Sequence, residues 1–128
     1  MKYVITLIVF LTTIVGVSQT KMEHVDAIIF KTWIDGKKAC LIDLRTDDEL
    51  KNKGFIKGAI QIDYLKKDAE DKIAKLDKKK TYLIYCAGGG RSGECAELME
   101  KLQFKHVINL EKGFDDWKKK GFAIEFKK

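Results

Sequence analysis

The chain alternates short apolar runs with longer stretches in which apolar residues recur at helical spacing. Short apolar runs are typical of buried strands, and the amphipathic stretches between them are typical of crossover helices. We therefore expect an α/β fold of three layers, in which helices cover both faces of a mainly parallel sheet of four or five strands. The strands are expected at residues 40–44, 59–62, 81–85 and 106–110, and the helices at 26–34, 46–53, 65–76, 92–103 and 114–120.

Two of these helices begin with capping signals. Asp26 is expected to cap the first helix, and Thr46 with Glu49 has the spacing of a capping box, in which each residue satisfies a backbone N–H of the other. Gly54 is expected to end that second helix. The chain contains no proline, so its turns depend on glycine, aspartate and asparagine.

The N-terminus has the pattern of an export signal. Lys2 is followed by an almost unbroken apolar stretch at residues 4–17, which ends in the small residues Gly16-Val17-Ser18. A membrane span needs roughly 20 apolar residues, so this stretch is short for one. We expect residues 1–18 to be a signal peptide cleaved after Ser18, with an uncleaved membrane anchor as the alternative. The mature domain, residues 19–128, would then be periplasmic or secreted, without stable membrane insertion.

The length and charge of the mature part limit the classes of function. Residues 19–128 form one domain's worth of chain. The net charge of the full chain is +6, and loss of Lys2 leaves 24 basic against 19 acidic residues, a net charge of +5. The lysines are interleaved with acids, which is typical of a solvated surface that attracts small anions. No basic stripe with interleaved aromatic residues is present, so we do not expect nucleic-acid binding.

Three cysteines are present, so at least one thiol cannot pair within the chain. Cys40 lies in a predicted strand and Cys95 on the apolar face of a predicted helix, and both are interpreted as core residues. A Cys40–Cys95 disulfide, or attack of Cys95 on an oxidised Cys86, remains an open alternative. The spacings do not resemble a zinc site, and only two histidines exist.

The candidate chemistry lies at Cys86, which follows the apolar run Tyr82–Tyr85 and precedes Ala87, Gly88, Gly89, Gly90, Arg91 and Ser92. Glycines let successive backbone N–H groups turn inward around an anion. A helix start and an arginine add positive potential at the same point, and together these effects favour the nucleophilic thiolate. Ligands of parallel sheets bind at the carboxyl ends of the strands, where Cys86 is expected to lie.

From about Leu41 to Ile124 the chain resembles the rhodaneses, a family of sulfurtransferases. The resemblance rests on three blocks in the family's order. The first block, at residues 41–60, is a strand end of the form Asp-x-Arg with a following Gly-Ala turn. The second, at residues 85–92, contains a cysteine followed by four residues and Arg-Ser. The third, at residues 110–117, is a closing block that ends in tryptophan.

The resemblance implies a reaction. Cys86 would take a sulfane sulfur from a small anionic donor such as thiosulfate, hold it as a persulfide, and pass it to cyanide or to a thiol, including a protein thiol. The backbone amides of residues 87–92 would cradle the sulfur, and Arg91 would help to hold the donor. The resemblance implies no metal and no organic cofactor.

Other notable residues are interpreted as structural. His24 and His106 lie far from Cys86 in sequence, and sulfur transfer needs no proton delivered to a sulfite leaving group. Arg45 is expected to pair with an acid such as Glu111, with Asp43 accepting backbone bonds, because buried charges are normally paired. Phe114 and Trp117 are expected in the core.

The chain also departs from the family pattern. Phe55 and Lys57 replace the histidine and proline of the usual turn, and the loop of Ala87 and three glycines lacks the larger polar residues that are common there. Donor recognition then falls to backbone amides and Arg91. Cysteine-dependent phosphatases and arsenate reductases are less favoured alternatives, because their loops are one residue longer. A persulfide carrier or an interaction module is the other alternative.

Overall fold

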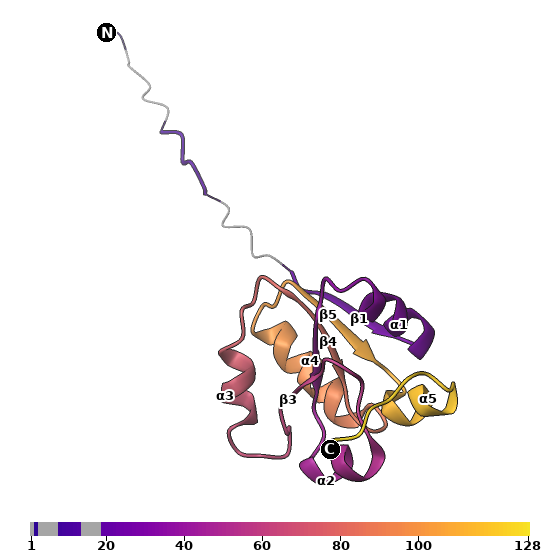
Figure 1. The fold of residues 1–128 in the computed structure, drawn as a ribbon. Coiled ribbons are helices and arrows are strands. Elements are labelled where there is room, and N and C mark those ends of the chain that lie inside the picture. The colour runs from indigo at the N-terminus through magenta and orange to yellow at the C-terminus, as the bar shows by residue number, and fades with distance from the viewer. Residues whose placement is uncertain (1, 3–7, 14–18) are drawn as a thin grey trace.

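The computed structural model describes residue 2, residues 8–13 and residues 19–128. Residues 19–128 form a five-stranded sheet in the order β1-β5-β4-β2-β3, and every ladder between named strands is parallel (Figure 1). The strands are β1 (Lys21–Val25), β2 (Cys40–Asp43), β3 (Ile60–Gln61), β4 (Thr81–Tyr85) and β5 (His106–Leu110). The expected α/β architecture is confirmed.

Helices cover both faces of this sheet. In Figure 1, α1 and α5 lie on one side and α3 and α4 on the other, while α2 lies at one end of the sheet. Two separate apolar cores result. Phe114 and Trp117 lie in the core beneath α1 and α5, which confirms their expected packing role. The helices are α1 (Ala27–Asp35), α2 (Asp47–Lys53), α3 (Ala69–Ala74), α4 (Gly90–Lys101) and α5 (Gly113–Lys119).

Two elements differ from the sequence-based expectation. Strand β1 was not predicted, because an edge strand is buried at few positions and here Val25 alone is fully buried. Helix α3 begins at Ala69 rather than at Leu65, because residues 64–68 form turns. The side chain of Asp63 accepts a hydrogen bond from the backbone N–H of Leu65 at 3.0 Å, a turn that competes with helix formation.

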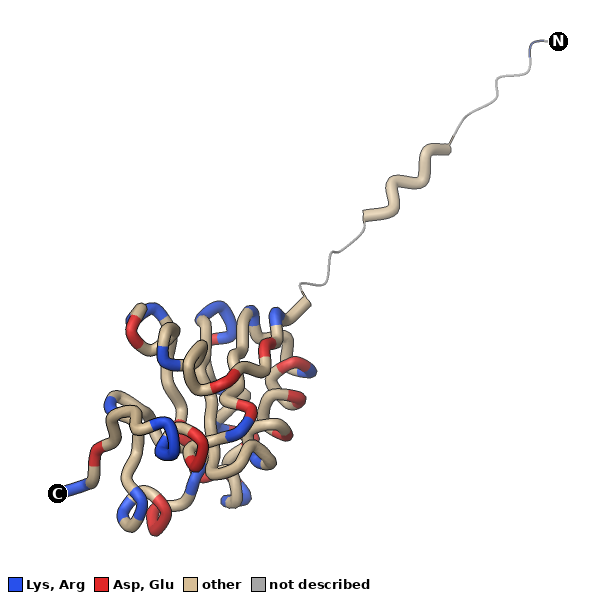
Figure 2. The backbone as a smooth tube through the Cα atoms, turned by 90° about the vertical axis from the view of Figure 1, so that its right-hand side faces the viewer, with Lys and Arg blue, Asp and Glu red and all other residues tan. Residues whose placement is uncertain are grey.

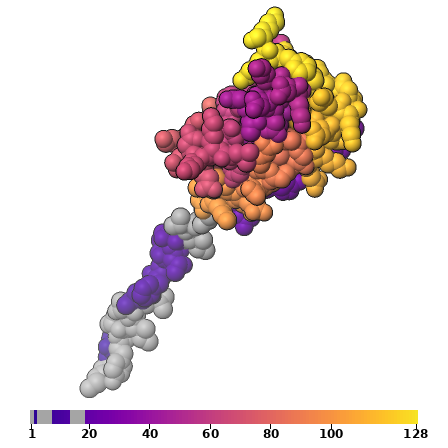
Figure 3. Space-filling view, turned by 90° about the horizontal axis from the view of Figure 1, so that it is seen from below, coloured from indigo at the N-terminus to yellow at the C-terminus, as the bar shows by residue number. Residues whose placement is uncertain are grey.

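The carboxyl ends of the strands meet α2 and the C-terminal segment. The capping box of α2 is present as predicted, with Thr46 and Glu49 bonded to each other's backbone N–H groups. Further along, Phe55 and Glu125 form an antiparallel bridge through two backbone hydrogen bonds of 2.7 and 2.8 Å. Figure 3 views this side of the molecule, where α2 lies between the region of α3 and the C-terminal segment.

The charged residues of both signs are spread over the whole fold (Figure 2), as expected for a solvated surface. Among the N-terminal residues that are described, 8–13 contain no helix or strand, and Ile8, Val9, Phe10 and Leu11 are exposed. The expected cleavage site after Ser18 lies outside the described residues. Within the described parts of the chain, no helix is long and apolar enough to cross a membrane.

Candidate active site

Strand β4 brings Cys86 to the carboxyl edge of the sheet. The strand is flanked by β2 and β5, and its residues from Tyr82 to Tyr85 are buried. Cys86 follows directly and is 1% exposed. A nucleophile in this position is held by a rigid strand while the loop after it is free to shape a site, which is the usual location of ligand sites in parallel sheets.

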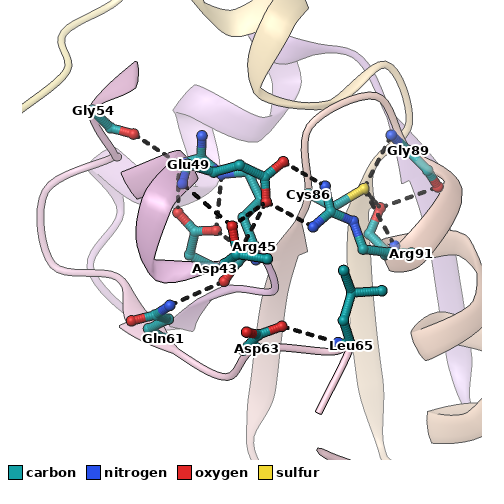
Figure 4. Close-up of polar contacts among 12 residues, drawn as sticks. Asp43, Arg45, Glu49, Gly54, Gln61, Asp63, Leu65, Cys86, Gly89 and Arg91 are labelled. Carbon is teal, nitrogen blue, oxygen red and sulfur yellow. Dashed lines mark hydrogen bonds and ion pairs between the residues drawn. The ribbon is translucent and has the colours of Figure 1, made fainter. Parts of the chain in front are cut away.

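The loop after Cys86 curls back over the sulfur. The backbone N–H of Gly89 donates to Sγ at 3.1 Å, and that of Ser92 donates at 3.4 Å. The hydroxyl of Ser92 lies 3.5 Å from the same sulfur, and Figure 4 shows Gly89 beside Cys86. Sγ therefore faces main-chain donors at the first turn of α4, where the positive end of the helix dipole also lies. The arrangement suits a sulfur that carries negative charge.

The carbonyl side of the loop faces the opposite way, toward α5. The carbonyl oxygen of Cys86 accepts from the N–H of Phe114 at 2.9 Å, and that of Ala87 accepts from Asp115 at 3.1 Å. These bonds satisfy the loop's acceptors at the first turn of α5. Because the carbonyls of Cys86 and Ala87 are fixed in this way, the N–H groups that follow can turn toward the thiol.

Two glycines make this close packing possible. Gly89 has a φ of +105°, and a Cβ there would lie 2.0 Å from the carbonyl oxygen of Glu111. Gly113, the first residue of α5, has a φ of +71°, and a Cβ there would lie 2.3 Å from the carbonyl oxygen of Ala87. Both positions combine a left-handed backbone with a backbone contact that leaves no room for a side chain. By contrast, a Cβ at Gly88 or Gly90 would meet no atom within 4 Å.

Arg91 is held by an acid from α2. Its guanidinium donates to both carboxylate oxygens of Glu49, at 2.8 and 2.7 Å (Figure 4). The bond to Arg91, helped by the backbone N–H of Thr46, lowers the pKa of Glu49 to about 2. In turn, Glu49 raises the pKa of Arg91. Contact of Arg91 with an anionic donor stays a prediction, and it requires the donor to share or replace this carboxylate.

Asp43 and Arg45 form a second, fully buried pair behind the site. The guanidinium donates to both oxygens of Asp43, at 3.0 and 2.8 Å, and also to the carbonyl of Gly54 at 2.8 Å. It lies 4.0 Å from the ring centre of Phe114. Asp43 accepts the backbone N–H of Arg45 as expected. The expected partner Glu111 is wrong, because its side chain is exposed and Arg45 bonds within its own strand end.

A family model agrees with this geometry. The rhodanese-like domain model matches residues 26–120, which include the loop, α2 and α5. The chain belongs to the rhodanese-like family. The three sequence blocks of the rhodanese resemblance therefore lie in one site: the Asp-x-Arg strand end, the cysteine loop, and the glycine that begins α5.

Three curated relatives are named as sulfurtransferases. The chain is 35% identical to YtwF of Bacillus subtilis over 60% of its length and 71% of that protein. It is 31% identical to the thiosulfate sulfurtransferase PspE of Escherichia coli, over 53% of its length and 64% of PspE. It is 32% identical to the adenylyltransferase/sulfurtransferase MoeZ of Mycobacterium tuberculosis over 70% of its length, but spans 23% of MoeZ. These relatives support a sulfurtransferase at the family level.

The fold of the domain matches a solved rhodanese-related structure. A rhodanese-related protein from Thermoplasma volcanium superimposes with a TM-score of 0.69 and 25% identity, covering 82% of this chain and 99% of that one. The match extends over nearly the whole of the compared protein, so the layers described above are those of a rhodanese-like domain.

The remaining cysteines and histidines have structural surroundings. All three cysteines are free thiols, and Cys95 is fully buried in the core beneath α4, as expected. Burial raises the pKa of Cys95 to about 12. Cys40 is half-buried at the start of β2. His106 contacts Glu23 at 2.5 Å, and His24 contacts Asn109 at 3.1 Å, so both histidines pair between β1 and β5.

Sequence reasoning missed two residues that shape the site. Glu49 was interpreted as a capping residue, and its second role toward Arg91 arises from a contact 42 positions away. Gly113 lies in the closing block at residues 110–117, and the sequence alone predicts no structural role for this glycine. Its signal was available in principle, since a glycine in a short connection between a strand and a helix often marks a close backbone approach.

The Glu49–Arg91 pair predicts an acid-sensitive stability. Because the pKa of Glu49 falls from its ordinary 4.5 to about 2 on folding, the stabilisation is full above pH 4.5 and is lost as the pH drops toward 2. We expect wild-type protein to lose on the order of 2 kcal/mol more than Glu49→Gln over this window. Urea titrations at several pH values measure the difference. The control variant Glu100→Gln, at an exposed acid of α4, should lose stability with falling pH as the wild type does. If the free energy of unfolding depends on pH in the same way for all three proteins, the prediction is contradicted.

Proposed function

We propose that Cys86 is the sulfur-carrying nucleophile of a sulfurtransferase that accepts a sulfane sulfur from a small anion such as thiosulfate. The observation that supports this most directly is the pair of backbone N–H groups, from Gly89 and Ser92, that donate to Sγ. Such donors stabilise negative charge on Sγ before the attack, and afterwards on the terminal sulfur of a persulfide.

The loading step balances without a further reactant. The Cys86 thiolate attacks the outer sulfur of thiosulfate, an S–S bond forms to Sγ, and the original S–S bond breaks with its electron pair leaving on sulfite. The product is the Cys86 persulfide anion. In the second step, cyanide or a thiol attacks the terminal sulfur, and the electron pair of the breaking bond returns to Sγ as thiolate. Each step is a displacement at sulfur, in the ping-pong order of covalent catalysis.

The arginine of the loop supports an anionic donor over a neutral one. Arg91 is 20% exposed and shares its charge with Glu49. An incoming anion would find a guanidinium already fixed in orientation beside the sulfur loop (Figure 4). We propose that the donor joins this pair, so Arg91 orients the donor while the amides of residues 87–92 receive the transferred sulfur.

Intact-mass measurement tests the loading step. Wild-type protein incubated with thiosulfate should gain one sulfur atom, and Cys86→Ser should gain none. Cys40→Ser is the matched control, because it removes a half-buried thiol at the opposite end of β2 and should load normally. Addition of cyanide should then restore the original mass and release thiocyanate. A mass gain that survives in Cys86→Ser would contradict the assignment of the nucleophile.

The same experiment separates enzyme from carrier. Repeated production of thiocyanate indicates turnover, whereas loading without discharge to cyanide or thiols indicates a persulfide carrier. No mass gain with thiosulfate or any other sulfane donor would favour an interaction module. We favour turnover, because the nucleophile, its amide donors and Arg91 are all present.

We also propose that residues 1–18 are a signal peptide and that the domain acts outside the cytosol. The support is the sequence pattern of Lys2, the apolar stretch and the small residues before Gln19. Expression of the full chain in a bacterial host, followed by N-terminal sequencing of the exported protein, tests this. A mature chain that begins at Gln19 is expected, and cytosolic protein with Met1 intact would contradict it.

A further inference from the structure

The segment between β3 and α3 runs beside the active-site loop. The N–H of Tyr64 donates to the carbonyl of Leu44 at 3.1 Å, and the N–H of Leu44 donates to the carbonyl of Tyr85 at 2.9 Å. Tyr85 directly precedes Cys86. Two successive backbone hydrogen bonds therefore connect this segment to the strand end that carries the nucleophile.

Within this segment, Leu65 is held outward. Tyr64 packs against the core that contains Cys86 and Cys95, and Asp63 accepts the N–H of Leu65 at 3.0 Å. The side chain of Leu65 is 67% exposed, more than any other large apolar residue of residues 19–128. In Figure 4 its side chain extends from this segment in the direction of Arg91. A single exposed apolar side chain is ordinary on a protein surface, but one on a segment tied to the nucleophile's strand can contact a partner that comes to the site.

The neighbours of Leu65 carry positive charge. Lys66 and Lys67 follow it in the same turn and are exposed, and neither has an ion-pair partner within residues 19–128. The exposed apolar side chain of Leu65 is therefore followed in sequence by two ammonium groups without an ion-pair partner among residues 19–128. Such a surface is complementary to an apolar residue flanked by acids.

The burial of Cys86 makes this surface relevant to the second step of the reaction. The residue is 1% exposed, so an acceptor must come close to the residues around the loop. Cyanide carries no flanking groups. A cysteine within a polypeptide brings flanking residues with it, and these need a surface near the loop to lie against.

We infer that the physiological acceptor is a protein thiol whose cysteine is flanked by apolar and acidic residues, and that Leu65 with Lys66 and Lys67 is its docking surface. The inference rests on the proposed function. In the transfer, the acceptor thiol gives its proton to the Cys86 persulfide anion, and the resulting thiolate attacks the terminal sulfur. A new S–S bond forms on the acceptor, and the electron pair of the old bond returns to Sγ, so atoms and charge balance. Leu65 positions the acceptor and takes no part in the bond changes.

Discharge rates of the loaded protein test this inference. The probes are cyanide, the peptide Asp-Leu-Cys-Val-Glu, and the peptide Lys-Ser-Cys-Ser-Lys. We expect wild-type protein to discharge to the acidic peptide at least about tenfold faster than to the basic one. Leu65→Ser should lose about tenfold in rate with the acidic peptide, which corresponds to about 1.4 kcal/mol, and keep its rate with cyanide. Leu65→Met should retain both rates.

Matched variants keep the test specific. Ile28→Ser changes an apolar residue of α1 that is 57% exposed and should alter neither rate. The double variant Lys66→Gln, Lys67→Gln should reduce the preference for the acidic peptide and its salt dependence. Loading is measured first, and failure to load counts against the proposed function. The inference itself is overturned if loaded Leu65→Ser discharges to the acidic peptide like wild type, or loses the same factor with cyanide.

Discussion

Gly113→Ala is expected to slow sulfur loading about 100-fold, although Gly113 is not among the residues that donate to the thiol. A Cβ there would lie 2.3 Å from the carbonyl oxygen of Ala87 and 2.7 Å from the nitrogen of Gly88. The loop must move away, and the hydrogen bonds from Phe114 and Asp115 to its carbonyls must lengthen or break. Movement of the loop displaces the amides that face Sγ, and a displacement of about 1 Å can reduce a reaction rate about 100-fold.

The same substitution should also destabilise the fold. An alanine at a φ of +71° costs about 1–2 kcal/mol, and the backbone clash adds a comparable amount, so we expect a loss of about 3 kcal/mol. Urea unfolding measures the stability, and intact mass after thiosulfate treatment measures loading. Measurements well below the unfolding midpoint separate a misplaced loop from an unfolded protein.

Gly93→Ala is the control for this experiment. Gly93 lies in the first turn of α4, and a Cβ there would meet no atom within 4 Å. Alanine in place of a helical glycine should stabilise the protein by about 0.5–1 kcal/mol and leave loading unchanged. If Gly113→Ala loads at the wild-type rate, the close approach of α5 does not hold the loop in place.

Asp43→Asn is expected to be the most damaging conservative change in the core of the site. It removes the negative charge that faces Arg45, and both side chains are fully buried. The guanidinium would then be an uncompensated charge in a dry interior, which costs about 3–5 kcal/mol. A domain of this size has roughly 5–15 kcal/mol of stability in total, so the loss would be visible as a large fall in the urea midpoint.

An exposed ion pair supplies the comparison. Asp35 bonds to Lys31 at 2.7 Å, but the two side chains are 60% and 44% exposed. Asp35→Asn should therefore cost less than about 0.5 kcal/mol. Adding Arg45→Met to Asp43→Asn should recover part of the loss, because the unpaired charge is then removed. Equal effects of Asp43→Asn and Asp35→Asn would show that the buried pair contributes no more than a surface one.

The position of the nucleophile could be predicted from sequence because it depends on local features. A buried run followed by a cysteine, three glycines and a helix start specifies a strand, a loop and a dipole within a dozen residues. The structure places the predicted amides of Gly89 and Ser92 on the sulfur. The capping box of α2 was predictable for the same reason.

The pairings between distant residues could not be predicted in this way. A buried arginine needs an acidic partner, but the sequence offers several acids near Arg45. The pairing with Asp43 depends on how the backbone turns at the end of the strand. Arg91 and Glu49 meet because α2 and the loop after β4 are brought to the same edge by the strand order. The edge strand β1 and the turns at residues 64–68 lack a clean periodicity, so tertiary pairing and local side-chain bonds decide them.

The bridge between Phe55 and Glu125 makes the tail of the chain part of the support for the nucleophile. Glu125 holds the turn at Gly54, and the carbonyl of Gly54 accepts a hydrogen bond from Arg45. The guanidinium of Arg45 in turn lies over the ring of Phe114. The backbone N–H of Phe114 donates to the carbonyl of Cys86. Removal of the residues after Gly121, which lie far outside the reactive loop, should therefore reduce the rate of sulfur loading at Cys86. Purification tags are better placed beyond Lys128 with a spacer than fused close to Phe126.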